Sequence, residues 1–407
     1  MKEALKRKLD DIGQATSVCF RVVFKDGSHY QNHSDGQPDI IIHINDNRAI
    51  ARIMIYGHIG LLESYFDNSL DVEGDLNLAF RAGMETDFSS HPPLPVRLRN
   101  RWHEFRHNNG TIERARENAD FHYALGTEFY RYWLDDPYMM YTCAYWKEGT
   151  QTLEQAQQNK MEHVCRKVRL QPGETFVDIG CGWGGFMRYA WEHYGTVGTG
   201  INITGEQVRN GNAMFEQLGL ADKLQIHDAD FREVHGEYDK SISIGVLEHA
   251  GRDQLENVVR AHARTMKPGG LGMIHFIGHV GHYETEFFIR DHIFPGGWIP
   301  SLSQAIDAME RCGLEVLDIE NLRRHYALTL DAWAERFDRH WDEIVALDPQ
   351  RFDETFRRKW RTYLYSCAEM FRSRNGYTHL FQVLVSKGNV DYDYPMSRAH
   401  IYRDDSA

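Results

Sequence analysis

The segment TFVDIGCGWGG, residues 175–185, constrains the fold most, because a short apolar run leads directly into closely spaced glycines. Gly180, Gly182 and Gly185 have the G-x-G-x-x-G spacing of a loop that joins a strand to a helix and approaches a ligand closely. From residue 174 onward, apolar runs alternate with helical patterns, which predicts a parallel sheet with helices on both faces. The predicted strands are TFVDIG, GTVGTGINI, KLQIHDAD, KSISIGVLE and GGLGMIHFIG.

The acidic residues around the glycines indicate which ligand the loop binds. A dinucleotide fold would have an acid about twenty residues further on, at the end of the second strand, for the ribose hydroxyls. Here that strand ends in GINITGEQ, with Asn202 and Thr204 and no carboxylate before Glu206. An acid instead precedes the glycines at Asp178. This pattern resembles the Rossmann-like methyltransferases, which bind S-adenosylmethionine.

Polar residues at the carboxyl ends of the predicted strands are candidate site residues, because ligands of open α/β sheets bind beyond those ends. Asp230 in DADFREV is placed to accept a hydrogen bond from an adenine amino group, with Phe231 stacking on the ring. The alternative is that Asp230 caps the following helix. The residues that converge on the crevice are Asp178, Asn202, Asp230, Glu248 and His275.

Longer motifs make the resemblance specific. The run YTCAYWKEGTQTLEQAQQNKMEHVCRKVRLQPGETFVDIGCGWGGF resembles the cyclopropane fatty acid synthases and the related mycolic acid methyltransferases. The similarity covers nearly everything from about Asp120 to Lys387. Upstream, GHIGLLESYFDNSLDVEGDL resembles the amino-terminal domain of the longer bacterial synthases, which favours the phospholipid-modifying branch. The further matching motifs are SIGVLEHAG, GMIHFIG, IFPGGWIPSL, HYALTLDAWAERF and YLYSCAEMFR.

The resemblance implies a class I methyltransferase domain with a helical lid. The implied reaction adds the methyl carbon of S-adenosylmethionine to a cis double bond in a phospholipid acyl chain, after which proton loss closes a cyclopropane. Because an alkene has no lone pair, the enzyme must align it with the sulfonium methyl and exclude water. Aromatic faces can stabilise the cation that forms on the acyl chain.

In this family a bicarbonate ion is the base, and its ligands match Cys143, Glu248, His275, Ile277 and Tyr326. Cys367 in YSCAEMF matches another cysteine treated as an active-site residue, although a covalent role is doubtful and a buried structural cysteine is the alternative. His249, next to the useful glutamate, is interpreted as structural. The cofactor residues implied are Tyr141, Thr142, Asp178, Gly180, Gly182, Gly184, Gly185, Asn202, Thr204, Gln207, Asp230 and Phe231.

One segment departs from the family pattern. Where relatives have an Asp and an Asn in HYDxGNxFY, this chain has HYALGTEFY, with Ala124 and Thr127. The segment lies beside the cofactor and the acyl entrance in relatives, so the departure bears on how the substrate is handled.

Prolines 92, 93 and 95 mark the predicted end of a small α+β domain. Its range is 1–95, followed by a helical linker over 96–119, a catalytic domain over 120–390 and a polar tail over 391–407. Within the first domain, DIIIHIND is a predicted strand and NRAIARIMIYGHIGLLESYFD a helical pattern. Because this domain has no catalytic signature, we expect it to dock on the membrane or to form a homodimer.

Composition excludes several classes of protein. A net charge of −13 disfavours nucleic-acid binding, although VRLRNRWHEFRHNNGTIERAR and FRRKWR mix arginines with aromatics in a way that suits an anionic membrane surface or a solvated helix face. Six scattered cysteines and 22 histidines show no metal-ligand spacing, so no metal is expected. No secretion signal or membrane-spanning run is visible, which predicts a cytoplasmic protein, peripherally bound to the inner face of the membrane.

Three alternatives remain open from the sequence. A fatty acyl C-methyltransferase that makes methyl-branched or methylene-branched chains would pass through the same cation. A nicotinamide oxidoreductase is disfavoured by the missing ribose acid. A non-catalytic lipid-binding protein is disfavoured by the polar residues at the strand ends.

Overall fold

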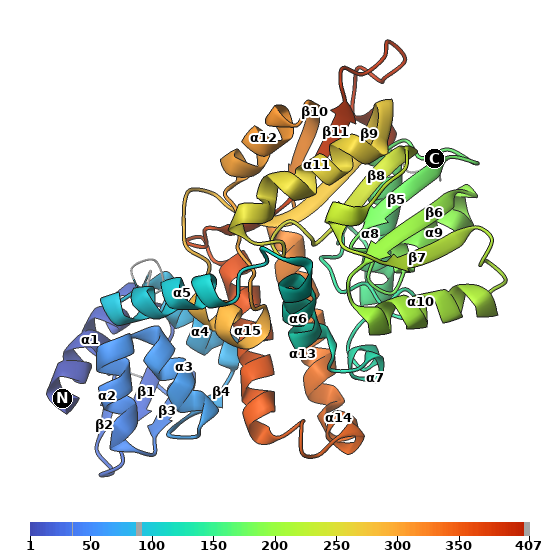
Figure 1. Cartoon of the computed structure of the whole chain (residues 1–407). Coiled ribbons are helices and arrows are strands. Elements are labelled where there is room, and N and C mark those ends of the chain that lie inside the picture. The colour runs from blue at the N-terminus through green and yellow to red at the C-terminus, as the bar shows by residue number, and fades with distance from the viewer. Residues whose placement is uncertain (35, 87–91, 403–407) are drawn as a thin grey trace. The chain divides into compact units, whose positions relative to one another are not determined.

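The computed structural model describes residues 1–34, 36–86 and 92–402, and the chain forms two compact units (Figure 1). Unit 1 comprises Met1–Arg106, Thr285–Ile293 and Leu330–Tyr377, and unit 2 comprises the remainder. The expected single catalytic range of 120–390 differs from this division, because two of its segments pack within unit 1 instead.

Unit 1 is an α+β structure around a four-stranded sheet of order β2-β1-β3-β4, in which only β1 and β3 are parallel. The predicted strand DIIIHIND forms β3, and the helical pattern after it forms two helices separated at Gly57. Helix α15, from much later in the chain, contacts α3 and α4 and completes the unit. Its elements are β1 (Phe20–Val23), β2 (His29–Gln31), β3 (Ile40–Ile44), β4 (Leu70–Gly74), α1 (Lys2–Ala15), α2 (Asn47–Tyr56), α3 (His58–Phe66), α4 (Leu76–Glu85), α5 (Leu94–Arg106), a π-helix (Ile289–Ile293), α14 (Trp341–Leu347) and α15 (Glu354–Arg372).

Unit 2 contains a seven-stranded sheet of order β10-β11-β9-β8-β5-β6-β7. The five strands predicted from the apolar runs are all present and mutually parallel, which confirms the α/β class. One antiparallel strand, β11, lies between β9 and β10. The strands are β5 (Thr175–Ile179), β6 (Val197–Asn202), β7 (Leu224–Asp228), β8 (Tyr238–Ile244), β9 (Met266–His279), β10 (Leu314–Asn321) and β11 (Thr378–Lys387).

Helices cover both faces of this sheet (Figure 1). One apolar core joins the sheet to α8, α9 and α10, and a second joins it to α11 and α12. Helix α13 begins in unit 2 and ends in unit 1. The helices are α6 (Ile112–Tyr123), α7 (Thr127–Arg131), α8 (Leu153–Lys167), α9 (Gly185–Tyr194), α10 (Gly205–Gln217), α11 (Leu255–Thr265), α12 (Leu302–Arg311), α13 (Arg323–Arg339), α16 (Ala399–Tyr402) and the 3-10 turns Phe231–Glu233 and Arg252–Gln254.

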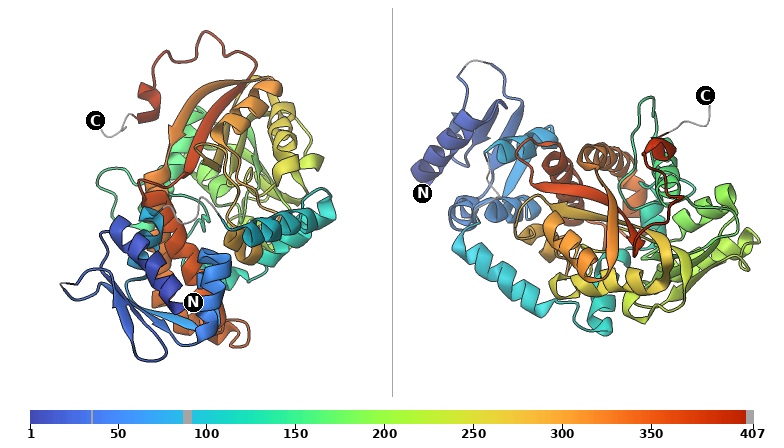
Figure 2. Two further views of the ribbon diagram at one scale, coloured as in Figure 1. Left: turned by 90° about the vertical axis from the view of Figure 1, so that its left-hand side faces the viewer. Right: turned by 90° about the horizontal axis from the view of Figure 1, so that it is seen from above.

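The predicted polar tail packs on unit 2 as far as residue 402. Helix α16 lies beside α8 (Figure 2). Ile401 is buried, and Arg398 forms an ion pair with Asp318 of β10. This part of the tail is therefore a packed element of the unit.

Within the part of the chain that the structure describes, no helix combines the length and the apolar character needed to cross a lipid bilayer.

Candidate active site

The glycine loop joins β5 to α9. At several of its positions, a side chain in place of glycine would strain the backbone or clash with a neighbouring residue. Gly180 and Gly182 have φ values of 76° and 57°, a region that favours glycine. A Cβ on Gly180 would lie 2.3 Å from Cγ2 of Val246, and one on Gly185 would lie 2.0 Å from the Tyr138 carbonyl oxygen. Gly184, in the left-handed conformation, caps α9. The loop therefore packs tightly against its neighbours and leaves its backbone accessible to a ligand.

Asn202, at the end of β6, ties this loop to α10. Its Nδ2 donates to the carbonyl oxygen of Gly182 at 3.0 Å and to Oε1 of Gln207 at 2.8 Å. Its Oδ1 accepts from the backbone N–H of Thr204 at 3.1 Å. Four predicted cofactor residues thus form one connected hydrogen-bonded group.

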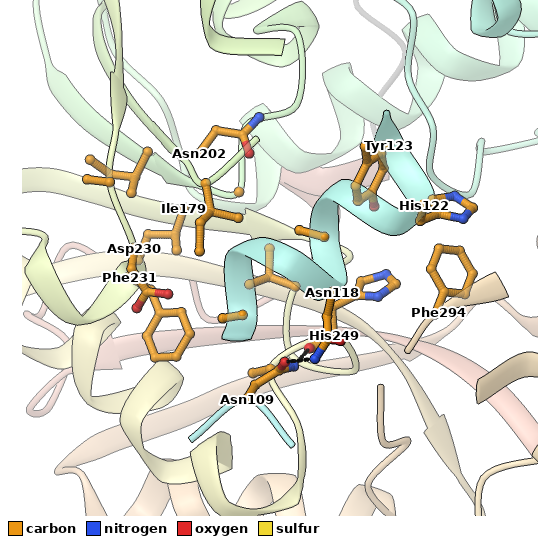
Figure 3. Close-up of a pocket in the computed structure, with 18 of the residues that line it drawn as sticks. Asn109, Asn118, His122, Tyr123, Ile179, Asn202, Asp230, Phe231, His249 and Phe294 are labelled. Carbon is orange, nitrogen blue, oxygen red and sulfur yellow. Dashed lines mark hydrogen bonds between the residues drawn. The ribbon is translucent and has the colours of Figure 1, made fainter. Parts of the chain in front are cut away.

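A pocket lies over the carboxyl ends of the strands of unit 2 (Figure 3). Gly180, Asn202, Asp230 and Phe231, all predicted cofactor residues, line it. Figure 3 shows α6 running across the pocket, with Asn118 and Tyr123 on the helix, as expected for a helical lid. The second helix of the predicted linker, 96–119, therefore lines the pocket.

Several pocket residues were not identified from the sequence. Asn118 Nδ2 donates to Oδ1 of Asn109 at 2.6 Å, and Asn109 Nδ2 donates to the carbonyl oxygen of His249 at 2.7 Å (Figure 3). His249 lines the pocket, and burial lowers its pKa to about 4, so it is neutral. His122, His249 and Phe294 lie within quoted family motifs, but only the fold shows that these distant segments meet at one pocket. The missed lining residues include Asn109, Asn118, His122, His249 and Phe294.

Asp230 caps the following 3-10 turn, as the alternative interpretation predicted. Its Oδ1 accepts from the backbone N–H of Arg232 at 2.9 Å, and the Arg232 guanidinium binds the same carboxylate at 2.6 Å. That guanidinium also lies over the Phe231 ring, 5.1 Å from its centroid. Asp230 and Phe231 are thus held rigidly at the pocket wall, and contact with adenine stays a prediction.

Beneath the loop lies a buried group of charged residues. Burial raises the pKa of Asp178 to about 7, opposed by the charge of Lys160. Lys160 is fully buried, its Nζ donates to Oγ1 of Thr142 at 2.8 Å, and burial lowers its pKa to about 8. Tyr141 Oη lies 3.1 Å from His122 Nε2. The segment 141–143 is therefore fixed between α6 and α8.

Glu248 and His275 each present an unused polar atom. Oε1 of Glu248 accepts from the Ile277 backbone N–H at 3.1 Å, while Oε2 is buried and bonds to none of the described residues. The Gln382 amide donates to His275 Nδ1 at 3.2 Å, which leaves Nε2 buried and likewise without a described partner. Burial raises the pKa of Glu248 to about 7 and lowers that of His275. Native proteins rarely leave such buried atoms unsatisfied, so each of these two atoms is a candidate partner for a small polar group.

Cys143 and Tyr326 lie on two segments that hydrogen bonds connect. The backbone N–H groups of residues 144 and 146 donate to Thr329 Oγ1 at 3.1 Å and His325 Nδ1 at 2.9 Å, on either side of Tyr326 in α13. Burial raises the pKa of Cys143, so its thiol stays protonated, and in this structure it donates to the carbonyl oxygen of Ala144 at 3.2 Å.

Cys367 belongs to a different compact unit from the other predicted site residues. It belongs to α15 in unit 1, whereas the others belong to unit 2. Burial raises its pKa to about 12, and a thiol with so high a pKa is a poor nucleophile. These observations favour the structural interpretation of Cys367.

Thr127, one of the two departures from the family pattern, joins the glycine loop to α10. Its hydroxyl donates to Glu206 Oε1 at 2.8 Å and accepts from Trp183 Nε1 at 3.1 Å and Asn210 Nδ2 at 2.6 Å. Thr127→Val keeps the shape but leaves these donors unsatisfied, which should lower the stability by about 1–3 kcal/mol. We expect a lower Tm in calorimetry. Thr127→Ser retains the hydroxyl and is the control, and equal losses in both variants would contradict this role.

Comparisons with known proteins agree with this geometry. Residues 111–383 match the family model described as mycolic acid cyclopropane synthetase. A probable fatty acid methyltransferase from Pseudomonas putida is 33% identical, over 96% of this chain and 98% of its own length. The cyclopropane-fatty-acyl-phospholipid synthase of Escherichia coli K12 is 32% identical, over 87% of this chain and 90% of its own.

A solved structure extends the similarity to three dimensions. The mycolic acid cyclopropane synthase CmaA1, complexed with SAH and CTAB, is 29% identical and superposes with a TM-score of 0.62. The match covers 67% of this chain and 98% of that chain.

Proposed function

This chain belongs to the mycolic acid cyclopropane synthetase family, and from that premise we propose that it makes cyclopropane fatty acyl phospholipids. Its relatives and structural neighbours are S-adenosylmethionine-dependent methyltransferases, and so is this chain. It is a cyclopropane synthase or a fatty acid methyltransferase. We propose a cyclopropane synthase, with an unsaturated phospholipid as acceptor and bicarbonate as base.

The residues around the glycine loop fit S-adenosylmethionine. The exposed backbone at Gly180 and the open space beside Gly182 suit the amino acid end, and Asn202 orients the adjoining strand end. Asp230 and Phe231 on the pocket wall suit the adenosine end. When bound, the cofactor supplies an electrophilic methyl carbon. The chain's task is then to hold that carbon against the double bond and to exclude water.

The single observation that carries the choice of ring closure is the pair of unsatisfied atoms on Glu248 and His275. Bicarbonate offers the small polar group that such a pair needs, and it would supply a base for proton removal. The Nε2–H of His275 can donate to an oxyanion, and the protonated Cys143 thiol can do so by rotating away from the Ala144 carbonyl oxygen, to which it donates at 3.2 Å. Glu248, with a pKa near 7, can hold the proton that leaves the acyl chain.

Aromatic rings line the pocket, which suits a cationic acyl intermediate. The His122 ring stacks on Tyr141, with 5.6 Å between centroids, and lies 4.1 Å from the Phe294 ring. The Glu248 charge contributes to raising the pKa of Tyr123, although burial is the larger cause, so Tyr123 stays a neutral phenol. Such a wall stabilises positive charge on the acyl chain and keeps out the water that would convert it to an alcohol.

The substrate suggests where the protein works. Phospholipid acyl chains lie within a bilayer, so the proposal includes peripheral contact of a cytoplasmic protein with the inner face of the membrane. Unit 1, which carries none of the cofactor residues, is proposed to mediate this contact or to form a homodimer.

A fatty acyl C-methyltransferase that makes branched chains is the second candidate. The Pseudomonas putida relative, which matches nearly the whole chain, carries that kind of name. Thr127, which bonds to the glycine loop through Trp183, also departs from the usual family pattern.

Transfer to lipid is tested by incubating the purified chain with methyl-labelled S-adenosylmethionine and vesicles of unsaturated phospholipid. We expect label in the acyl chains after the head groups are removed, and none with saturated vesicles. Label on free unsaturated fatty acid alone would overturn the phospholipid acceptor, and absence of label from both lipids would overturn the transfer reaction itself.

A further inference from the structure

On helix α5, the polar residues Arg99, Asn100 and His103 lie on the side that packs against the protein, together with the buried Val96. Arg99 forms an ion pair with Glu63 at 2.7 Å. Asn100 donates to the carbonyl oxygen of Thr285 at 3.1 Å. His103 is buried, although it is ionisable. All these contacts lie within unit 1, so the inward face of α5 is fixed by polar interactions.

The outward face of α5 carries large apolar side chains instead. Leu94, Leu98, Trp102 and Phe105 are 64%, 60%, 62% and 73% exposed. At about 100° per residue they fall within a sector of roughly 80° on the helix. The Trp102 and Phe105 rings also contact each other, with centroids 6.1 Å apart. A contiguous exposed apolar stripe of this kind marks an interaction surface, because folding alone gives no reason to expose it.

Arginines flank this stripe. On the same helical projection, Arg97 and Arg101 lie along one side and Arg106 along the other. All three are exposed, and none forms an ion pair with the described residues. The single acid of the helix, Glu104, is half-buried and pairs with Arg290 at 3.2 Å. In a chain of net charge −13, this face is a local basic surface.

The other basic cluster noted in the sequence, FRRKWR, does not form such a surface. Arg358 is buried and pairs with Asp71 at 3.1 Å, and Arg361 pairs with Asp338 at 3.1 Å. The charges of Arg358 and Arg361 are therefore paired with carboxylates within unit 1.

We propose that the outward face of α5 inserts into an anionic phospholipid surface and holds the enzyme at its substrate. This inference rests on the proposed function, because it assigns the membrane contact to a particular face. Interfacial helices combine Trp, Phe and Leu on one side with flanking Arg, as α5 does. A second copy of the chain is a poorer occupant, since a symmetric contact through the same face would bring like-charged arginines together.

Flotation of the full-length protein with vesicles tests the proposal. The probe is unsaturated phosphatidylethanolamine with phosphatidylglycerol, compared with phosphatidylcholine alone. Leu98→Ser/Trp102→Ser/Phe105→Ser should lower binding to the anionic vesicles at least about tenfold. Arg97→Gln and Arg101→Gln should each lower it roughly fivefold, with little effect on phosphatidylcholine. The matched control replaces exposed apolar residues elsewhere, Leu218→Ser/Ile319→Ser/Leu347→Ser, and should bind like wild type.

Methyl transfer to detergent-dispersed lipid separates this inference from the proposed function. The triple α5 variant should keep the wild-type rate on dispersed lipid and lose it on vesicles. If wild type transfers methyl to neither form, the proposed function fails, and flotation still decides the role of α5. Unchanged vesicle binding in the triple variant, or an equal loss in the control, would overturn the inference. A change of oligomeric state with unchanged vesicle binding would assign the face to a contact between copies, which overturns it too.

Discussion

Glu248→Gln should lower kcat for transfer by about 100-fold or more, the usual range for losing a positioned proton acceptor. Gln keeps an oxygen for the Ile277 N–H, which lies 3.1 Å from Oε1 in the native protein, so the local backbone contact survives. The amide cannot take up a proton. Because burial raises the pKa of Glu248 to about 7, wild-type activity should rise with pH through this value. The variant should lose that dependence, as pH profiles of kcat would show.

Stability gives an independent check on the same residue. The folded-state pKa of Glu248 lies above the ordinary value of 4.5, so folding favours its protonated form. Its contribution to stability is therefore present at low pH and lost as pH rises from about 4.5 to 7. The Tm of Glu248→Gln relative to wild type should increase over this interval. The exposed Glu237→Gln is the control and should change neither quantity. Retention of kcat in Glu248→Gln would remove Glu248 from the chemistry.

Gly180→Ala should weaken S-adenosylmethionine binding at least about tenfold, whereas Gly182→Ala should weaken it by less than about threefold. Both residues have positive φ, so each alanine carries a similar backbone cost of about 1–2 kcal/mol. Only at Gly180 would the new Cβ meet a neighbour, Cγ2 of Val246 at 2.3 Å, and Val246 lines the pocket. A Cβ at Gly182 would meet nothing within 4 Å. Calorimetric titration with the cofactor measures the difference.

Removing the clash should rescue binding. Val246→Ala in the Gly180→Ala background takes away the atom that the new Cβ meets, so affinity should return to within a few-fold of wild type. The Tm should remain lowered, because the backbone cost persists. Equal cofactor affinities for the two single alanine variants would show that the loop does not approach the cofactor at Gly180.

Much of unit 2 could be predicted from sequence, because its strands are nearly continuous apolar runs between helical patterns. Of the five strand-end residues expected to meet at one crevice, Asn202 and Asp230 line the pocket, whereas Asp178, Glu248 and His275 are not among the residues that line it. Parallel topology brings strand ends together, so local patterns were sufficient for those two. The antiparallel strand β11 and the packing of α15 into unit 1 were not predicted, since both depend on contacts between distant segments.

The polar wall contributed by α6 could not be predicted for the same reason. Asn109 precedes α6 and Asn118 lies within it, neither in a recognisable motif, and only the fold joins them to His249. The sequence also did not predict the direction in which a side chain points. No local pattern distinguishes the arginines of VRLRNRWHEFR from one another. In the structure, however, Arg99 forms an ion pair with Glu63, while Arg97 and Arg101 lie on the exposed face. Tertiary contacts, which no local pattern encodes, make this distinction.

The bonding of the transferred carbon distinguishes ring closure from branching. The purified chain is incubated with unsaturated phospholipid vesicles and S-adenosylmethionine carrying a ¹³C methyl group, and the acyl products are examined by NMR. If the enzyme closes a ring, we expect a labelled methylene carbon with the upfield proton signals of a cyclopropane. Mass alone is insufficient, because a ring and a methylene branch are isomers. A labelled methyl signal, or vinylic protons on the labelled carbon, would contradict ring closure and assign the protein to branched-chain methylation.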